Sequence, residues 1–110
     1  MKFLWKATAW NNGTHKPSGA GYGLKIGAED RDRLFRKDWE NVLLRLEGEK
    51  DEITVNMNKK SFWDPECREL ISKKVGLWLI KNRKAPWPQG CPPKISLEPT
   101  TGNRFSVEFI

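Results

Sequence analysis

Residues 94–110 read KISLEPTTGNRFSVEFI, and apolar side chains alternate with polar ones on both sides of a turn. The alternating apolar positions are Ile95, Leu97, Phe105, Val107 and Phe109. Between them, Pro99-Thr-Thr-Gly-Asn103 has the composition of a turn. Because a period of two places every second side chain on the same face, the stretch predicts two strands that each bury one face.

Four further segments predict strands for the same reason, or because they are short and apolar. They are residues 3–9, 21–26, 41–47 and 53–57, and the last two form a hairpin around the turn Gly48-Glu-Lys-Asp51. The chain thus contains pairs of neighbouring strands, which favours a sheet that is mainly antiparallel.

Helices are expected between these strand pairs. Ala28–Lys37 has acidic residues first and basic residues last, an order that complements the helix dipole. Asp64-Pro65-Glu66 is typical of a helix start, and we expect that helix to run toward Ile71. Ser72 then caps a helix through Asn82, with Leu77 and Ile80 exposed on its outer side.

The predicted fold is α+β, with the order β-β-α-β-β-α-β-β in a single domain spanning residues 1–110. We expect a small mixed, mainly antiparallel β-barrel with two to three short helices. Residues 84–94 (KAPWPQGCPPK) contain four prolines, which excludes them from helix or sheet interiors.

The net charge of +6 is unevenly distributed along the sequence. Residues 59–94 hold nine lysines and arginines against three acidic residues, so this segment carries the whole excess. A concentrated basic region suits a polyanion such as nucleic acid, although a charge of this size also serves solubility alone.

No motif for catalysis or metal binding stands out. Cys67, Cys91 and the single His15 lack the spacing of a zinc site, and no nucleophile motif is present, so we expect no catalytic residue, metal or cofactor. Lys6 interrupts the first apolar run, and no window approaches 18 apolar residues. We therefore expect a cytoplasmic protein with reduced thiols and no membrane contact.

Two polar loops are candidates for binding. Residues 11–25 (NNGTHKPSGAGYGLK) lie between two strands and lack a GK[ST] motif, which excludes a phosphate loop followed by a helix. The segment is either a connector with permissive glycines or an arm that contacts nucleic acid. Residues 58–63 (NKKSFW) are the second candidate, unless Phe62 and Trp63 simply close the core.

Two stretches resemble the DNA-binding pseudobarrel family, which includes plant transcription-factor domains and restriction-endonuclease effector domains. They are KATAWNNGTHKPSGAGYGLKI with the following AEDRDRLF, and LWLIKNRKAPWPQGCPPKISLEPTTGNRFSVEF. The resemblance implies a pseudobarrel whose two loops grip DNA like a wrench, here at 11–18 and 58–63. The proline-rich loop and the highly charged first helix depart from the family pattern.

Three functions follow as hypotheses. The leading one is a non-enzymatic protein that binds nucleic acid, with duplex DNA favoured over RNA. Its expected contact residues are Asn12, Thr14, His15, Lys16, Lys25, Asn58, Lys59, Lys60 and Trp63. The second is a protein-interaction module or homodimer that uses Leu77, Ile80, Lys81, Lys84 and Trp87. The third is a ribonuclease-type toxin.

Overall fold

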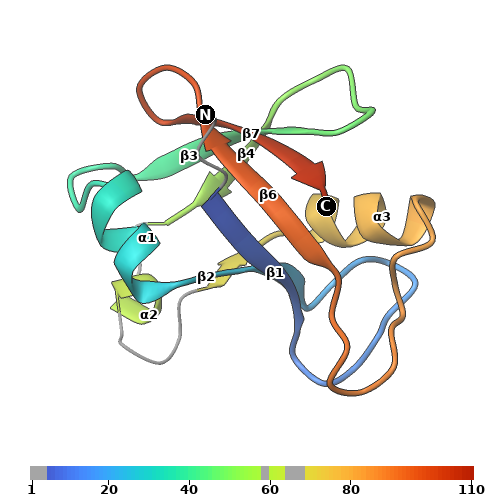
Figure 1. Ribbon diagram of the computed structural model, residues 1–110. Coiled ribbons are helices and arrows are strands. Elements are labelled where there is room, and N and C mark those ends of the chain that lie inside the picture. The colour runs from blue at the N-terminus through green and yellow to red at the C-terminus, as the bar shows by residue number, and fades with distance from the viewer. Residues whose placement is uncertain (1–4, 58–59, 64–68) are drawn as a thin grey trace.

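A computed structural model describes residues 5–57, 60–63 and 69–110, and it is an α+β fold built on one seven-stranded sheet. The sheet curls into a nearly closed barrel with the strand order β4-β3-β7-β6-β1-β2-β5 (Figure 1). The strands are β1 Trp5–Asn11, β2 Tyr22–Ile26, β3 Asn41–Leu46, β4 Ile53–Asn56, β5 Glu69–Ile71, β6 Lys94–Pro99 and β7 Arg104–Phe109. The helices are α1 Ala28–Leu34, α2 Lys60–Trp63 and α3 Lys73–Lys81.

The hairpin of β6 and β7 joins the two halves of the sheet. β6 pairs with β1 antiparallel, whereas β7 pairs with β3 in parallel, with Leu44 opposite Phe105. The other pairings between described strands are antiparallel. The expected mixed, mainly antiparallel barrel is therefore confirmed, and residues 94–110 hold its centre.

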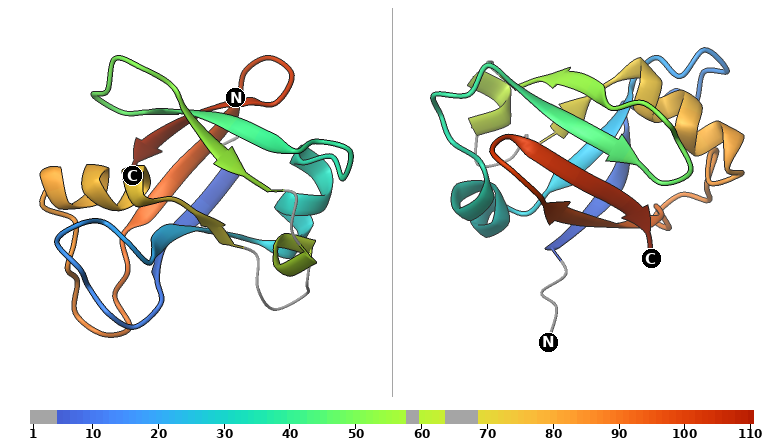
Figure 2. Two further views of the ribbon diagram at one scale, coloured as in Figure 1. Left: turned by 180° about the vertical axis from the view of Figure 1, so that it is seen from behind. Right: turned by 90° about the horizontal axis from the view of Figure 1, so that it is seen from above.

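Alternation along the strands fills the barrel with one apolar core. Inward positions such as Leu24, Leu44 and Val107 are fully buried. From α3, Trp78 is 1% exposed and its ring stacks on Phe109 with 4.2 Å between ring centroids. Figure 2 shows α3 at one end of the barrel and α1 with α2 at the other.

The prediction of a helix running from 64 toward Ile71 is wrong at Glu69–Ile71. These residues form β5, which pairs antiparallel with β2 and buries Leu70. Gly23 permits this pairing, because a Cβ there would lie 2.4 Å from the Leu70 carbonyl oxygen. The predicted helix start at 64–66 lies outside the described residues, and the order gains one strand, giving β-β-α-β-β-α-β-α-β-β.

Two helix predictions differ from the structure only at their ends. α1 stops at Leu34, before the predicted end at Lys37, because Phe35 turns extended and enters the core, where it stacks on Phe105. α3 spans Lys73–Lys81, one residue short of the predicted end at Asn82, and Ser72 occupies the N-cap position without a side-chain capping hydrogen bond. Residues 82–93 form neither helix nor strand. Within the described ranges, no helix has the length and apolarity needed to cross a membrane.

Candidate nucleic-acid interface

Two long loops lie side by side at one end of the barrel (Figures 1 and 2). Loop A, residues 12–21, connects β1 to β2, and loop B, residues 82–93, connects α3 to β6. β1 pairs with both β2 and β6, and the Ala9 amide donates to the Pro93 carbonyl at 2.9 Å. β2 and β6 both run antiparallel to β1, so both begin at the end of the sheet where β1 stops. The loops that lead into β2 and β6 therefore lie next to each other.

An aromatic cluster joins the loops to each other and to the barrel. His15 Nδ1 lies 2.6 Å from the Tyr22 hydroxyl, and the His15 and Trp87 rings meet edge to face at 4.8 Å. Tyr22 also contacts Trp87, at 5.7 Å between ring centroids. Tyr22 is 1% exposed, and burial raises the pKa of its phenol, so the ring stays neutral at ordinary pH. His15 is therefore tied to the barrel, and it holds the middle of loop A.

Side-chain amides order the start of loop A. The Asn11 side chain accepts from the Gly13 amide at 2.8 Å and donates to the Thr14 carbonyl at 3.0 Å. The Asn12 side chain accepts from the Thr14 amide at 3.2 Å. Asn12 was predicted to reach bases, and here its side-chain oxygen also shapes the loop.

The far side of loop A packs on α3. A Cβ at Gly19 would lie 2.5 Å from the Lys73 carbonyl oxygen, so the glycine allows the loop backbone to touch the helix. Between this packing and the aromatic cluster, the side chains of Thr14, Lys16 and Ser18 are exposed. Lys16 forms no ion pair within the described part of the chain.

A cleft of about 650 Å³ opens between the end of β1 and the two loops. The side chains that give it chemical character are Trp10, Asn11, His15, Trp87 and Gln89. Sequence reasoning missed the contributions of Trp10 and Gln89. Trp10 did carry a signal, because Ala7 and Ala9 face the core and strand alternation then places a large aromatic on the outer face.

A row of polar residues crosses the outer face of the sheet beside this end. Thr8 pairs with Lys25 on β2 and with Lys94 on β6, so the two lysines flank it. Glu69 on β5 stands opposite Lys25 and closes the row. Lys94 is exposed and Lys25, opposite Glu69, is half-buried.

The second predicted contact segment lies elsewhere. Asn58 and Lys59 are outside the described residues, and Lys60 begins α2. Two cations lie over the Trp63 ring, with the Arg31 guanidinium carbon at 5.4 Å and the Lys37 amine at 5.5 Å from its centroid. Loop A and α2 lie at opposite ends of β2, so the structure does not bring the two predicted segments together (Figures 1 and 2).

Arg31 explains how Trp63 is held, and the sequence did not reveal its role. It is 7% exposed, and it donates to the Phe62 carbonyl at 3.0 Å and to the Asp32 carboxylate at 3.1 Å. Within the charged run EDRDR no pattern distinguishes the buried arginine from its solvated neighbours. Arg31 therefore has a structural role that fixes α2 against α1.

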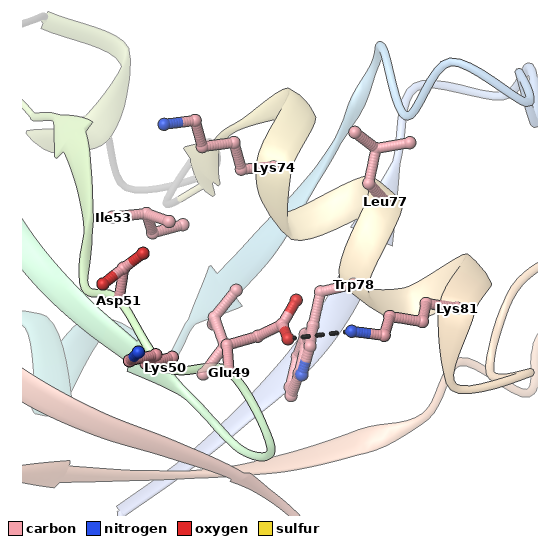
Figure 3. A pocket seen from close by; sticks show the side chains of 9 residues that line it. Glu49, Lys50, Asp51, Ile53, Lys74, Leu77, Trp78 and Lys81 are labelled. Carbon is pink, nitrogen blue, oxygen red and sulfur yellow. Dashed lines mark hydrogen bonds and ion pairs between the residues drawn. The ribbon is translucent and has the colours of Figure 1, made fainter.

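The residues of the predicted interaction surface on and after α3 lie in different environments and do not form one surface. Leu77 is 45% exposed, as expected, but Ile80 is half-buried and packs against the core, which corrects its expected exposure. Lys84 lies over the Phe109 ring at 5.2 Å, and Trp87 belongs to the aromatic cluster. Leu77 borders a groove of about 390 Å³ between α3 and the β3–β4 turn (Figure 3).

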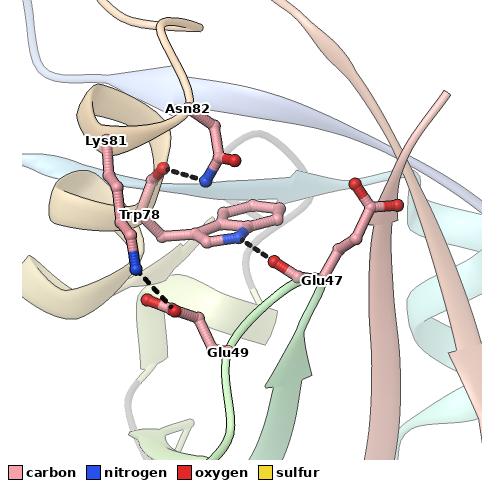
Figure 4. Close-up of polar contacts among 5 residues, drawn as sticks. All are labelled: Glu47, Glu49, Trp78, Lys81 and Asn82. Carbon is pink, nitrogen blue, oxygen red and sulfur yellow. Dashed lines mark hydrogen bonds and ion pairs between the residues drawn. The ribbon is translucent and has the colours of Figure 1, made fainter.

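Two contacts fasten α3 to the β3–β4 turn at this groove (Figure 4). The Trp78 indole donates to the Glu47 carbonyl at 2.9 Å, and the Lys81 amine pairs with the Glu49 carboxylate at 3.0 Å. Lys81 was predicted to contact another protein, but its ion-pair partner is Glu49 of the same chain.

Comparison with protein-family models, curated proteins and solved structures finds no match to this chain. Within the described residues, no group of three or more His, Cys, Asp and Glu is placed to hold a metal ion. A functional conclusion therefore rests on the geometry and chemistry of the loops themselves.

Proposed function

We propose that this protein binds duplex DNA through loops A and B and the adjoining outer face of β1, β2 and β6. The observation that carries this proposal is that the sheet places both loops at one end of the barrel, beside the row of polar residues that contains Lys25 and Lys94. Residues 70–97, which include α3 and loop B, contain six lysines and arginines and no acidic residue. Such a basic surface attracts the phosphate backbone.

The side chains in this region divide by chemistry. Lys16, Lys25 and Lys94 supply charge for phosphates, whereas Thr14 and His15 supply hydrogen-bonding groups for base edges. Segment 58–63 serves as a second contact, beyond the far end of β2. The five residues of β2 span roughly 17 Å, which is enough to cross a major groove about 12 Å wide.

The test is a mobility-shift comparison of duplex DNA, single-stranded DNA and RNA across a range of salt concentrations. Duplex DNA is expected to bind most tightly, with an affinity that falls as salt rises. Lys16→Ala and Lys25→Ala should each reduce the slope of log K against log salt by about 1. Lys50→Ala is the matched control, because this exposed lysine lies in the β3–β4 turn, away from loops A and B (Figure 1).

Two results would overturn the proposal. One is the absence of any duplex shift at about 50 mM salt, where phosphate contacts are strong. The other is an equal loss of slope in Lys50→Ala and Lys16→Ala, since a signal from net charge alone would need no particular surface.

A homodimer through the outer side of α3 is the second candidate. It is favoured by the exposed Leu77 at the edge of the groove in Figure 3. Sedimentation at high protein concentration would then show a dimer that Leu77→Ser converts to a monomer. A monomeric wild-type protein removes this candidate.

A further inference from the structure

The lining of the cleft between loops A and B contains no acidic residue, lysine or arginine, although its surroundings are basic. Beside the five side chains named above it is lined by Ala9, Gly13, Gly90 and Pro92, so none of its lining residues is Lys, Arg, Asp or Glu. A phosphate would find no lysine or arginine inside it, and a metal ion would find no carboxylate. A planar heterocycle would instead meet aromatic rings and amides.

The two tryptophans of the cleft come from different elements. Trp10 lies on the outer face of β1 directly opposite Gly23, which has no side chain to cover the indole. Trp87 comes from loop B, and its edge-to-face contacts with His15 and Tyr22 fix its ring. Aromatic rings held in place in this way are the platforms on which unpaired bases stack.

Polar groups in the cleft remain available to a ligand. Gln89 is exposed and makes no hydrogen bond within the described residues. His15 uses Nδ1 for the Tyr22 hydroxyl, which leaves Nε2 for another partner. An amide can donate and accept at once, which matches the paired donors and acceptors along the edge of a nucleobase.

We propose that this cleft receives the unstacked base of a nucleotide in bulged or mismatched DNA, while Lys16 and Lys94 contact its phosphates. This inference rests on the proposed DNA binding and adds a substrate class to it. The cleft volume of about 650 Å³ falls within the roughly 300–1,000 Å³ of small-molecule sites. A base that is already unpaired enters at the least energetic cost.

The experiment compares a duplex carrying a one-nucleotide bulge with the matched duplex, by fluorescence polarisation. A 2-aminopurine in the bulge reports the stacking environment of the base. Wild-type protein should bind the bulged duplex about ten-fold more tightly, as expected for one base–aromatic stack. Gln89→Ala and Trp87→Phe should weaken binding of the bulged duplex more than binding of the matched duplex, so that the preference falls. Far-ultraviolet circular dichroism identical to wild type checks that both variants fold. Lys16→Ala should weaken both duplexes equally.

A free nucleoside 5′-monophosphate forms a separate arm, followed by NMR of the tryptophan side chains. One outcome is that only the mononucleotide binds, and that Gln89→Ala and Trp87→Phe both lose affinity for it. The cleft would then bind a free nucleotide and not DNA, and the proposed function would be wrong. Equal affinity for bulged and matched duplexes, or an undiminished preference in both variants, overturns the cleft proposal and leaves duplex binding intact. If the protein binds neither duplex and does not bind the mononucleotide, both proposals are overturned.

Discussion

Tyr22 places a phenol at the meeting point of the core and the two loops. It is the only tyrosine in the sequence, so the ultraviolet absorbance of phenolate reports this residue alone. Burial raises the pKa of its hydroxyl, and we expect the absorbance midpoint of the folded protein to lie above the ordinary value near 10.

The same shift has a consequence for stability. The neutral phenol stabilises the fold below pH 10, and this contribution is lost as pH rises above 10 toward the higher folded pKa. Tyr22→Phe should show no such absorbance change. A wild-type midpoint at or below 10 would contradict the burial seen here.

Gly76 and Gly19 mark the closest approach between α3 and loop A. A Cβ on Gly76 would lie 2.3 Å from the Gly19 carbonyl oxygen and 2.7 Å from its Cα. Gly76→Ala should therefore destabilise the protein by about 1–3 kcal/mol in urea unfolding, even though alanine favours a helix. Gly27→Ala is the control, since the nearest atom to its Cβ would be 3.6 Å away. Equal stability of the two variants would contradict the contact.

At the scale of the element, α3 depends on one buried anchor and one exposed ion pair (Figure 4). Trp78→Phe removes the hydrogen bond to the Glu47 carbonyl and part of the stacking on Phe109. We expect it to lower the free energy of unfolding by about 2–4 kcal/mol. Lys81→Ala removes the pair with Glu49 and should cost less than about 1 kcal/mol, because that amine is exposed. Thermal unfolding of both variants checks the ranking, and a larger loss in Lys81→Ala would refute it.

The strands and α3 were predictable because their signals are local. Side-chain alternation located five of the six longer strands, the apolar run 41–47 located the sixth, and the apolar face of 72–82 located the helix. β5 was not predictable, because three residues carry no period, and they form a strand only where β2 needs a partner along its edge. The early end of α1 was likewise decided by tertiary packing, through the place that Phe35 takes in the core.

At the scale of the whole molecule, the candidate interface depends on the strand order. The polar character of loop A was legible in the sequence, and so was the basic character of the segment that includes loop B. Their adjacency was not, because it follows from β1 lying between β2 and β6. The cleft side chains Trp10 and Gln89 are far apart in sequence, and only this arrangement brings them to the same cleft.

The sheet order also determines how the molecule should unfold. The β3–β4 hairpin attaches through the parallel β3–β7 pairing, where Phe105 is 1% exposed and stacks on Phe35 at 4.8 Å. Because the buried side chains on both sides of this pairing form one core, we expect a single cooperative transition. Phe105→Ala should cost about 3–5 kcal/mol.

Amide hydrogen exchange is the sharpest measurement of this cooperativity, since it separates the strands. The slowest amides of β3 and β1 should open with the same free energy, and Phe105→Ala should lower both equally. Urea unfolding followed by tryptophan fluorescence and by far-ultraviolet circular dichroism should give coincident curves. If the amides of β3 and β4 exchange at a lower free energy than those of β1, the hairpin is a separate unit that merely docks on β7.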